Sequence, residues 1–218
     1  MVRYFKELIW KEFYLVRQFA ISPSDYRVSA ISNNEILKRI FLLIAIELPI
    51  MFVIILITAS IEELTSLDLG DHKLEKIYKE SPIFFILSGV VLAPIFEEFF
   101  FRFFITFRFA FYFTLPLRLV YNYLGIARKI QLFNMRKTWK KTFPYIFYLS
   151  VVAFGLVHIT NFEGYRSYLW AIPLLTLPQL VIGVFLGYTR IRYGFRWSIL
   201  FHALHNGILL VPALAFEG

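Results

Sequence analysis

The sequence Phe96-Glu97-Glu98-Phe99-Phe100-Phe101-Arg102 lies in the middle of an apolar segment that runs from residue 82 to residue 113. A helix needs about 20 apolar residues to cross a bilayer, so this segment is long enough. An ionisable side chain at the centre of a membrane costs ~2.5–3.5 kcal/mol even on lenient scales, which makes such residues candidates for a functional site. The segment therefore predicts a membrane-spanning helix that carries chemistry.

The whole chain has the composition expected of an integral membrane protein. Of its 218 residues, 59% are hydrophobic and only 17% are charged. Long apolar runs without strict alternation favour helices, because helices satisfy their own backbone hydrogen bonds in lipid. Candidate spans cover residues 40–60, 82–113, 144–162, 170–190 and 197–214. We predict an all-α fold: a polytopic transmembrane helical bundle of about five spans.

The N-terminal part of the chain has a different pattern. Residues 2–20 place apolar side chains near helical spacing, with Lys and Arg between them, which predicts an amphipathic surface helix. We expect residues 1–39 to form an N-terminal cytoplasmic amphipathic segment. Residues 40–218 then form the transmembrane domain, with a functional core at about 82–210.

The net charge of +8 is distributed asymmetrically along the chain. Lys and Arg cluster before residue 40, in the connection 114–143 and in the short link 190–196, all on one side of a five-span bundle. The positive-inside rule makes that side cytoplasmic, so we expect a cytoplasmic N-terminus and a cell (plasma) membrane location. The basic residues indicate topology and contact with anionic lipid of the bilayer, and we expect no nucleic-acid partner.

Several classes of site are excluded by motifs that the chain lacks. There is no Cys, which excludes disulfides, thiolate metal sites and a Cys nucleophile. The HExxH pair of metal-dependent intramembrane proteases, the GxSG serine loop and the GxGD aspartyl motif are also absent. A glutamate-centred arrangement remains.

The two adjacent glutamates cannot perform the same task, because neighbouring residues of a helix point about 100° apart. Glu98 and Arg102 are spaced i, i+4 and can pair along one helix face. Glu97 is then the free carboxylate, which suits a general base or acid. A polar clamp between helices, without chemistry, is the structural alternative.

Histidine and asparagine side chains occur in two other apolar segments. His158 closes the third span, and His202 and Asn206 share one helix face in the fifth, with His205 nearby as a ligand, a supporting partner or a bystander. A carboxylate, two imidazoles and an amide can activate water and stabilise an oxyanion. They can equally form a divalent-metal site, because His and Glu are ordinary zinc ligands.

Two expectations about these segments depend on how the helices pack in three dimensions. If the third and fifth spans both run outward, His158 and His202 differ in depth by roughly 10 Å at 1.5 Å per residue. Among the other polar residues, we expect Glu47 in the first span to form a structural hydrogen bond. We expect Arg108 to extend toward the inner face and His72 to be solvated in a polar loop.

The three polar motifs together resemble one family of membrane endopeptidases. Glu97 to Arg102 is similar to the EExxxR motif of the CPBP (CAAX protease and bacteriocin-processing, or Abi) family. Phe154 to His158 is similar to its FxxxH motif, and His202 to Asn206 to its HxxxN motif, in the same order. The resemblance covers about residues 82–210.

The resemblance implies an all-helical intramembrane endopeptidase, of which the type II CAAX prenyl protease is the best-known kind. It implies that Glu97 activates water with help from His158, that Glu98 holds Arg102, and that His202 and Asn206 stabilise the oxyanion. Family members are often labelled metalloproteases. If a divalent metal such as zinc is present, Glu97, His158 and His202 are the expected ligands, whereas a metal-free mechanism uses the same residues.

The expected substrate is a peptide or lipidated protein at the membrane, either a prenylated CAAX protein or a leader peptide. One alternative is a non-proteolytic bacteriocin-immunity or adaptor protein that uses the same fold to bind a partner. A second is a small transporter, which the absence of paired interrupted helices disfavours. Loss of cleavage with binding retained in Glu97→Gln separates an enzyme from an adaptor.

Overall fold

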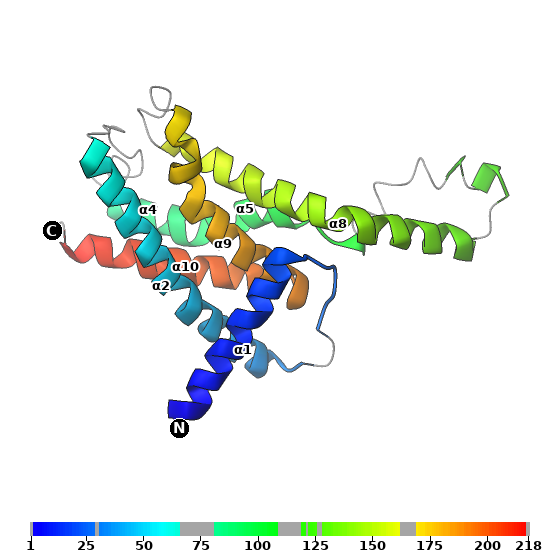
Figure 1. Cartoon of the computed structure of the whole chain (residues 1–218), viewed down its shortest axis with the longest axis horizontal. Helices are drawn as coiled ribbons and strands as arrows, with labels where there is room; N and C mark the ends of the chain where they lie inside the picture. The colour runs from blue at the N-terminus through cyan, green and yellow to red at the C-terminus, as the bar shows by residue number, and fades with distance from the viewer. Residues whose placement is uncertain are drawn as a thin grey trace.

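The computed structural model of the chain describes residues 2–28, 31–65, 81–108, 119–120, 122–125, 128–161 and 169–216. Every regular element within these residues is a helix, which confirms the predicted all-α class. In chain order they are α1 (Val2–Ile21), α2 (Asn33–Thr65), α4 (Pro82–Ile86), the π-helix η1 (Leu87–Leu92), α5 (Ala93–Arg102), α8 (Arg128–His158), the 3-10 helix η2 (Ile159–Asn161), α9 (Ile172–Arg192) and α10 (Phe195–Phe216) (Figure 1).

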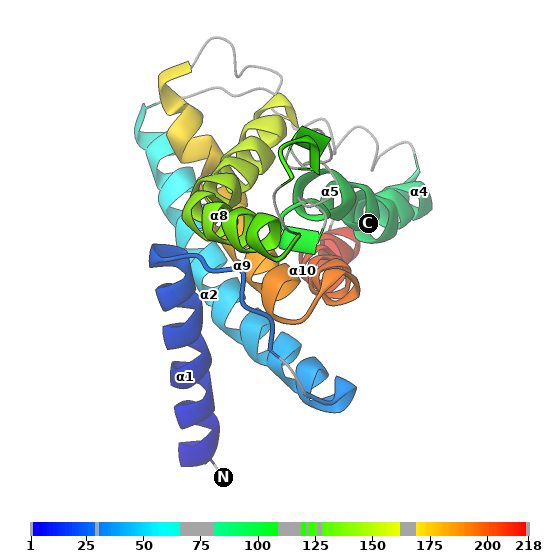
Figure 2. The same cartoon turned by 90° about the vertical axis from the view of Figure 1, so that its right-hand side faces the viewer.

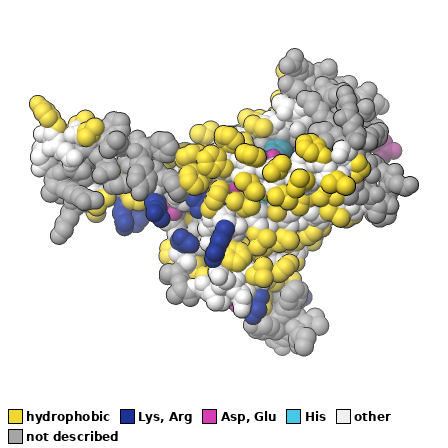
Figure 3. All heavy atoms as spheres, turned by 180° about the vertical axis from the view of Figure 1, so that it is seen from behind, with side chains coloured by type: hydrophobic (Ala, Val, Ile, Leu, Met, Phe, Trp, Pro, Cys, Tyr) yellow, Lys and Arg dark blue, Asp and Glu magenta, His cyan; other side chains and the backbone are white. Residues whose placement is uncertain are grey.

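Four stretches of the described chain are long and apolar enough to cross a membrane: Asn33–Thr65, Pro82–Arg102, Leu132–Asn161 and Leu169–Arg192. They correspond to the first four predicted spans, and the fifth predicted span falls on α10, which is not among these four. Large apolar side chains cover the outside of the bundle, where Phe52 is 62% and Phe100 67% exposed. Figure 3 shows hydrophobic side chains as a broad band on one face, which is the surface that lipid requires.

Basic residues just before the third predicted span continue the helix of that span. Residues 136–141 belong to α8, which continues without interruption from Arg128 to His158. Pro144 lies inside this helix without ending it. The helix that carries His158 is therefore longer than the predicted span 144–162, and residues 114–118, 121, 126 and 127 of the basic connection 114–143 lie outside the described part of the chain.

The helix α1 packs against α2 and α9, and Figures 1 and 2 show it crossing beside α2. Its buried face places the Phe19 ring 5.0 Å from the ring centroid of Phe147 and 5.4 Å from that of Tyr188. The buried Glu12 carboxylate pairs with Arg39 of α2. The amphipathic pattern therefore buries its apolar stripe against the helices of the bundle.

Two glycines of α9 allow α8 and α9 to approach closely. A Cβ atom on Gly187 would clash with the ring of Phe147, and one on Gly183 would lie 3.3 Å from Val151 Cγ1. Small residues four apart are a common device for close helix packing in membranes. The same Cβ position on Gly183 would lie 3.4 Å from Arg102 Nη2, so the missing side chain also leaves space for a buried guanidinium.

Candidate active site

The helix α5 buries a complete ion pair in the centre of the bundle. Arg102 Nη1 donates to Glu98 Oε1 at 3.1 Å, and both side chains are fully buried. The hydroxyl of Ser198 on α10 donates to the other oxygen of Glu98. The guanidinium carbon of Arg102 lies 3.8 Å from the centroid of the Phe154 ring, a cation–π contact. The predicted i, i+4 pair is thus present, and its charges are compensated from two further helices.

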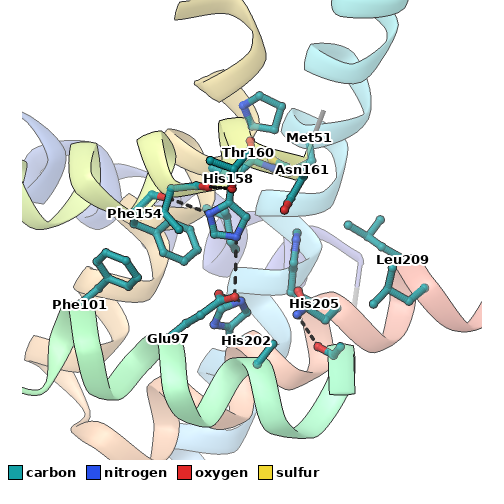
Figure 4. Close-up of a pocket in the computed structure, with 18 of the residues that line it drawn as sticks. Met51, Glu97, Phe101, Phe154, His158, Thr160, Asn161, His202, His205 and Leu209 are labelled. Carbon is teal, nitrogen blue, oxygen red and sulfur yellow. Dashed lines mark hydrogen bonds and ion pairs between the residues drawn. The ribbon is translucent and has the colours of Figure 1, made fainter. Parts of the chain in front are cut away.

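Glu97 points to a different side of α5, where two imidazoles approach its carboxylate. His158 Nε2 lies 3.8 Å from Glu97 Oε1, and His202 Nε2 lies 3.5 Å from Glu97 Oε2 (Figure 4). The side chain of Glu97 is 26% exposed, in contrast to the fully buried Glu98. Distances of this size leave the carboxylate and the imidazoles within reach of one bridging water.

The orientation of His158 follows from a backbone hydrogen bond. Its Nδ1 lies 2.7 Å from the carbonyl oxygen of Phe154, one turn earlier in α8. Because a carbonyl only accepts, Nδ1 carries the proton and donates. The Nε2 atom that faces Glu97 is then an acceptor in the neutral imidazole, and a proton or a water hydrogen is needed between it and the carboxylate.

His202 contacts both glutamates with its two ring nitrogens. Nδ1 lies 3.4 Å from Glu98 Oε1, while Nε2 faces Glu97. The expected depth difference of roughly 10 Å does not separate His158 from His202. The reason is that α5 packs against both α8 and α10, so that each histidine reaches Glu97 from its own helix.

Asn206 is fixed by an unusual backbone feature of the second span. In η1 the N–H of Ala93 bonds to the carbonyl of Ser88, five residues earlier. The next bond of this register would join residue 94 to Gly89, but Pro94 has no N–H to donate. The Asn206 amide instead donates to the carbonyl of Gly89 at 2.7 Å. Such π-turns are frequently found at functional sites.

A cavity of about 590 Å³ joins these side chains (Figure 4). Its polar wall includes Glu97, His158, Asn161, Gln179, His202 and Asn206. Apolar side chains from α2, α5, α8, α9 and the second half of α10, including Met51 and Leu209, form the remaining wall. A cavity of this size with few converging polar groups is the usual form of a substrate site.

His205 also lines the cavity, and the structure identifies its partner. Its Nδ1 lies 3.0 Å from Oε2 of Glu47, which is fully buried in α2. The sequence predicted a structural hydrogen bond for Glu47 but gave no way to name the partner. The pair joins α2 to α10 directly beside the cavity.

Other polar residues differ in how well the sequence indicated them. Arg108 is exposed, and His72 lies outside the described residues. Neither Ser198 nor Gln179 belongs to a predicted motif, although Ser198 precedes His202 by about one helical turn. Gln179 lines the cavity, and its buried Oε1 has no hydrogen-bond partner among the residues that the structure describes. The sequence indicates Ser198 and Gln179 by their polarity within otherwise apolar spans.

A metal site requires several ligand side chains that converge on one point. In the described part of the chain, no group of three or more His, Asp or Glu side chains is arranged to hold a metal ion. A zinc ion needs ligand atoms converging at about 2.0–2.2 Å. The arrangement of Glu97, His158 and His202 in this structure therefore does not fit a zinc site.

Comparison with known proteins gives one match. The family model for the type II CAAX prenyl endopeptidase Rce1-like family matches residues 79–208, more than half of the chain. This range contains α5, the end of α8 and the first half of α10, and so every polar motif of the cavity. Neither the curated proteins nor the solved structures contain a match to this chain.

Proposed function

Because the chain belongs to the type II CAAX prenyl endopeptidase Rce1-like family, and so is a membrane protease, we propose that Glu97 is the catalytic base of an intramembrane endopeptidase. The observation that carries this proposal is the approach of two imidazoles from two different helices to the one partly exposed carboxylate. Glu98 cannot take this role, because Arg102 and Ser198 occupy its oxygens.

In the proposed reaction, a water molecule between Glu97 and His158 loses a proton to the carboxylate and attacks the peptide carbonyl. Nε2 of His158 accepts a hydrogen bond from this water, because Nδ1 is committed to the Phe154 carbonyl. Glu97 then returns the proton to the leaving amine, so that the C–N bond breaks and the carboxylate is regenerated.

Negative charge on the attacked oxygen is stabilised by His202 and Asn206. For this step Nε2 of His202 carries the donated hydrogen, while Nδ1 of the same ring lies 3.4 Å from Glu98 Oε1. One amide hydrogen of Asn206 is used by Gly89, which leaves the second for the oxyanion. Glu98, Arg102 and Ser198 position His202.

The substrate is a membrane-associated peptide or protein, for which a prenylated CAAX segment and a leader peptide are the two proposed classes. We also propose a plasma-membrane location with the N-terminus in the cytoplasm. The asymmetric placement of Lys and Arg supports this orientation. No metal-dependent step is included, because the donor arrangement does not fit one.

A cleavage assay in liposomes tests the proposal, using a quenched prenylated CAAX peptide and a panel of leader peptides. Glu97→Gln should still bind the peptide that the wild type cleaves but should no longer cleave it. The control Glu63→Gln, at an exposed position, should cleave like the wild type. If Glu97→Gln cleaves normally, Glu97 is not the base. Binding without cleavage by the wild type across the panel would favour the immunity or adaptor function.

A further inference from the structure

A second cavity of about 420 Å³ lies away from the active site, where α9 turns into α10. Its walls come from the connection between α1 and α2, the first turn of α2 and the first turn of α10. The connection is anchored, because Val28 N–H donates to the carbonyl of Arg192 at 3.1 Å and Arg192 Nη1 donates to the carbonyl of Tyr26 at 2.8 Å. Two hydrogen bonds therefore hold the part of the cavity wall that comes from the α1–α2 connection against the end of α9.

Two guanidinium groups line this cavity. Arg196 Nη2 donates to Asn33 Oδ1 at 2.8 Å, and its guanidinium carbon lies 5.1 Å from the centroid of the Trp197 ring. Arg27 Nη2 lies 3.3 Å from the place where a Cβ atom on Gly194 would be, and Gly194 has a φ of +110° that suits glycine alone. The turn thus provides the space beside the Arg27 guanidinium.

Arg27 and Arg196 form no ion pair with any carboxylate in the described part of the chain. The neighbouring cations differ, since Arg39 pairs with Glu12 and Glu35, and Lys38 lies 3.9 Å from Glu35. Arginine binds phosphate oxygens with a planar fork of N–H donors, so two guanidiniums without a carboxylate partner among the described residues favour a phosphate ligand.

The position of the cavity indicates where that phosphate comes from. Asn33 is the first residue of a candidate membrane span, and α9 ends at Arg192, so the cavity lies at the ends of two spans. Ile31, Ile36 and Trp197 form an apolar wall beside the two arginines. Tryptophan is typical of the membrane–water interface, where phospholipid phosphates lie. Figure 3 shows Lys and Arg side chains gathered beside the hydrophobic band.

We propose that this cavity binds the phosphate of an anionic phospholipid between Arg27 and Arg196, with the lipid chains along the apolar wall. The site is separate from the proposed catalytic cavity and does not depend on the proposed reaction. Free phosphate shares the same chemistry, so the experiment separates the two sources.

Thermal unfolding of the full-length protein in neutral detergent measures this binding. Phosphatidylglycerol in mixed micelles should raise the unfolding midpoint, while phosphatidylcholine should not. The double variant Arg27→Gln/Arg196→Gln should need roughly tenfold more phosphatidylglycerol for the same shift, which corresponds to the loss of about one charge-assisted contact. The matched control is Lys38→Gln, which removes one charge from the same end of α2 and should respond like the wild type.

Two further measurements complete the test. Inorganic phosphate alone, if it reproduces an Arg-dependent shift, supports the phosphate site and identifies free phosphate as its ligand. If the double variant does not fold, Arg196→Lys keeps the charge without the planar fork and should show a partial loss. An equal response to phosphatidylglycerol in the wild type and the arginine variants, or no response in the wild type, would overturn the proposal.

Discussion

The Nε2 atom of His202 lies 3.5 Å from the Glu97 carboxylate, and the Nδ1 atom of the same ring lies 3.4 Å from the Glu98 carboxylate. One imidazole thereby links the partly exposed glutamate to the buried ion pair. The adjacent glutamates of the second span consequently have different environments, and only Glu97 lines the cavity.

Removing one partner of the buried Glu98–Arg102 ion pair should destabilise the protein more than removing both partners. Glu98→Leu leaves a fully buried guanidinium without its carboxylate and should lower the free energy of unfolding by about 3–5 kcal/mol. The double variant Glu98→Leu/Arg102→Met should recover most of that loss, because no unpaired charge remains. Chemical unfolding in detergent measures both, and additive effects of the two substitutions would show that the pair is not coupled.

The double variant should also separate stability from activity. We expect it to fold but to cleave poorly, because Glu98 no longer contacts His202 Nδ1. Wild-type cleavage by this folded variant would show that Glu98 does not position His202.

Asn206→Ala should lower kcat by about 10²–10³-fold, the effect of removing one oxyanion donor. The KM value should change little, because this donor acts on charge that develops in the transition state. Steady-state kinetics on a cleaved peptide checks the prediction, with the exposed Asn34→Ala as the control. A large rise in KM at unchanged kcat would instead indicate a role in substrate binding.

The Glu47–His205 pair should stabilise the packing of α2 on α10. Glu47→Leu leaves the buried His205 Nδ1 without its acceptor and should cost about 1–3 kcal/mol of unfolding free energy. Glu47→Gln keeps an oxygen acceptor and should cost less. Thermal unfolding of the two variants tests this order, which would be refuted by equal midpoints.

Metal removal should leave cleavage unchanged. The proposed mechanism uses no metal ion, and the described His, Asp and Glu side chains form no group arranged to hold one, so a strong chelator should not lower the rate. The assay compares rates before and after incubation with the chelator. Loss of activity that zinc restores would establish a metal at the site and require a different mechanism.

The sequence predicted the contacts that depend on spacing within one helix. The Glu98–Arg102 pair follows from i, i+4 geometry, and His202 and Asn206 lie on one face of α10 for the same reason. The class of the fold followed from the length and polarity of the apolar runs.

The contacts between helices could not be predicted, because they depend on how distant segments pack. Neither the Glu47–His205 pair nor the Ser198–Glu98 hydrogen bond has a local signal in the sequence. The bond from Asn206 to Gly89 requires a π-turn, and the proline that frees this carbonyl is recognised only once the backbone register is known. The approach of both His158 and His202 to Glu97 likewise depends on the packing of α5 against α8 and α10.

The most direct test of the account compares peptide cleavage by Glu97→Gln, His158→Ala and the double variant under single-turnover conditions. Because both side chains act on the same water molecule, their effects should not add. We predict that each single variant loses cleavage by at least about 10²-fold and that the double variant is no slower than the slower single variant. Wild-type cleavage by folded Glu97→Gln would contradict the central claim.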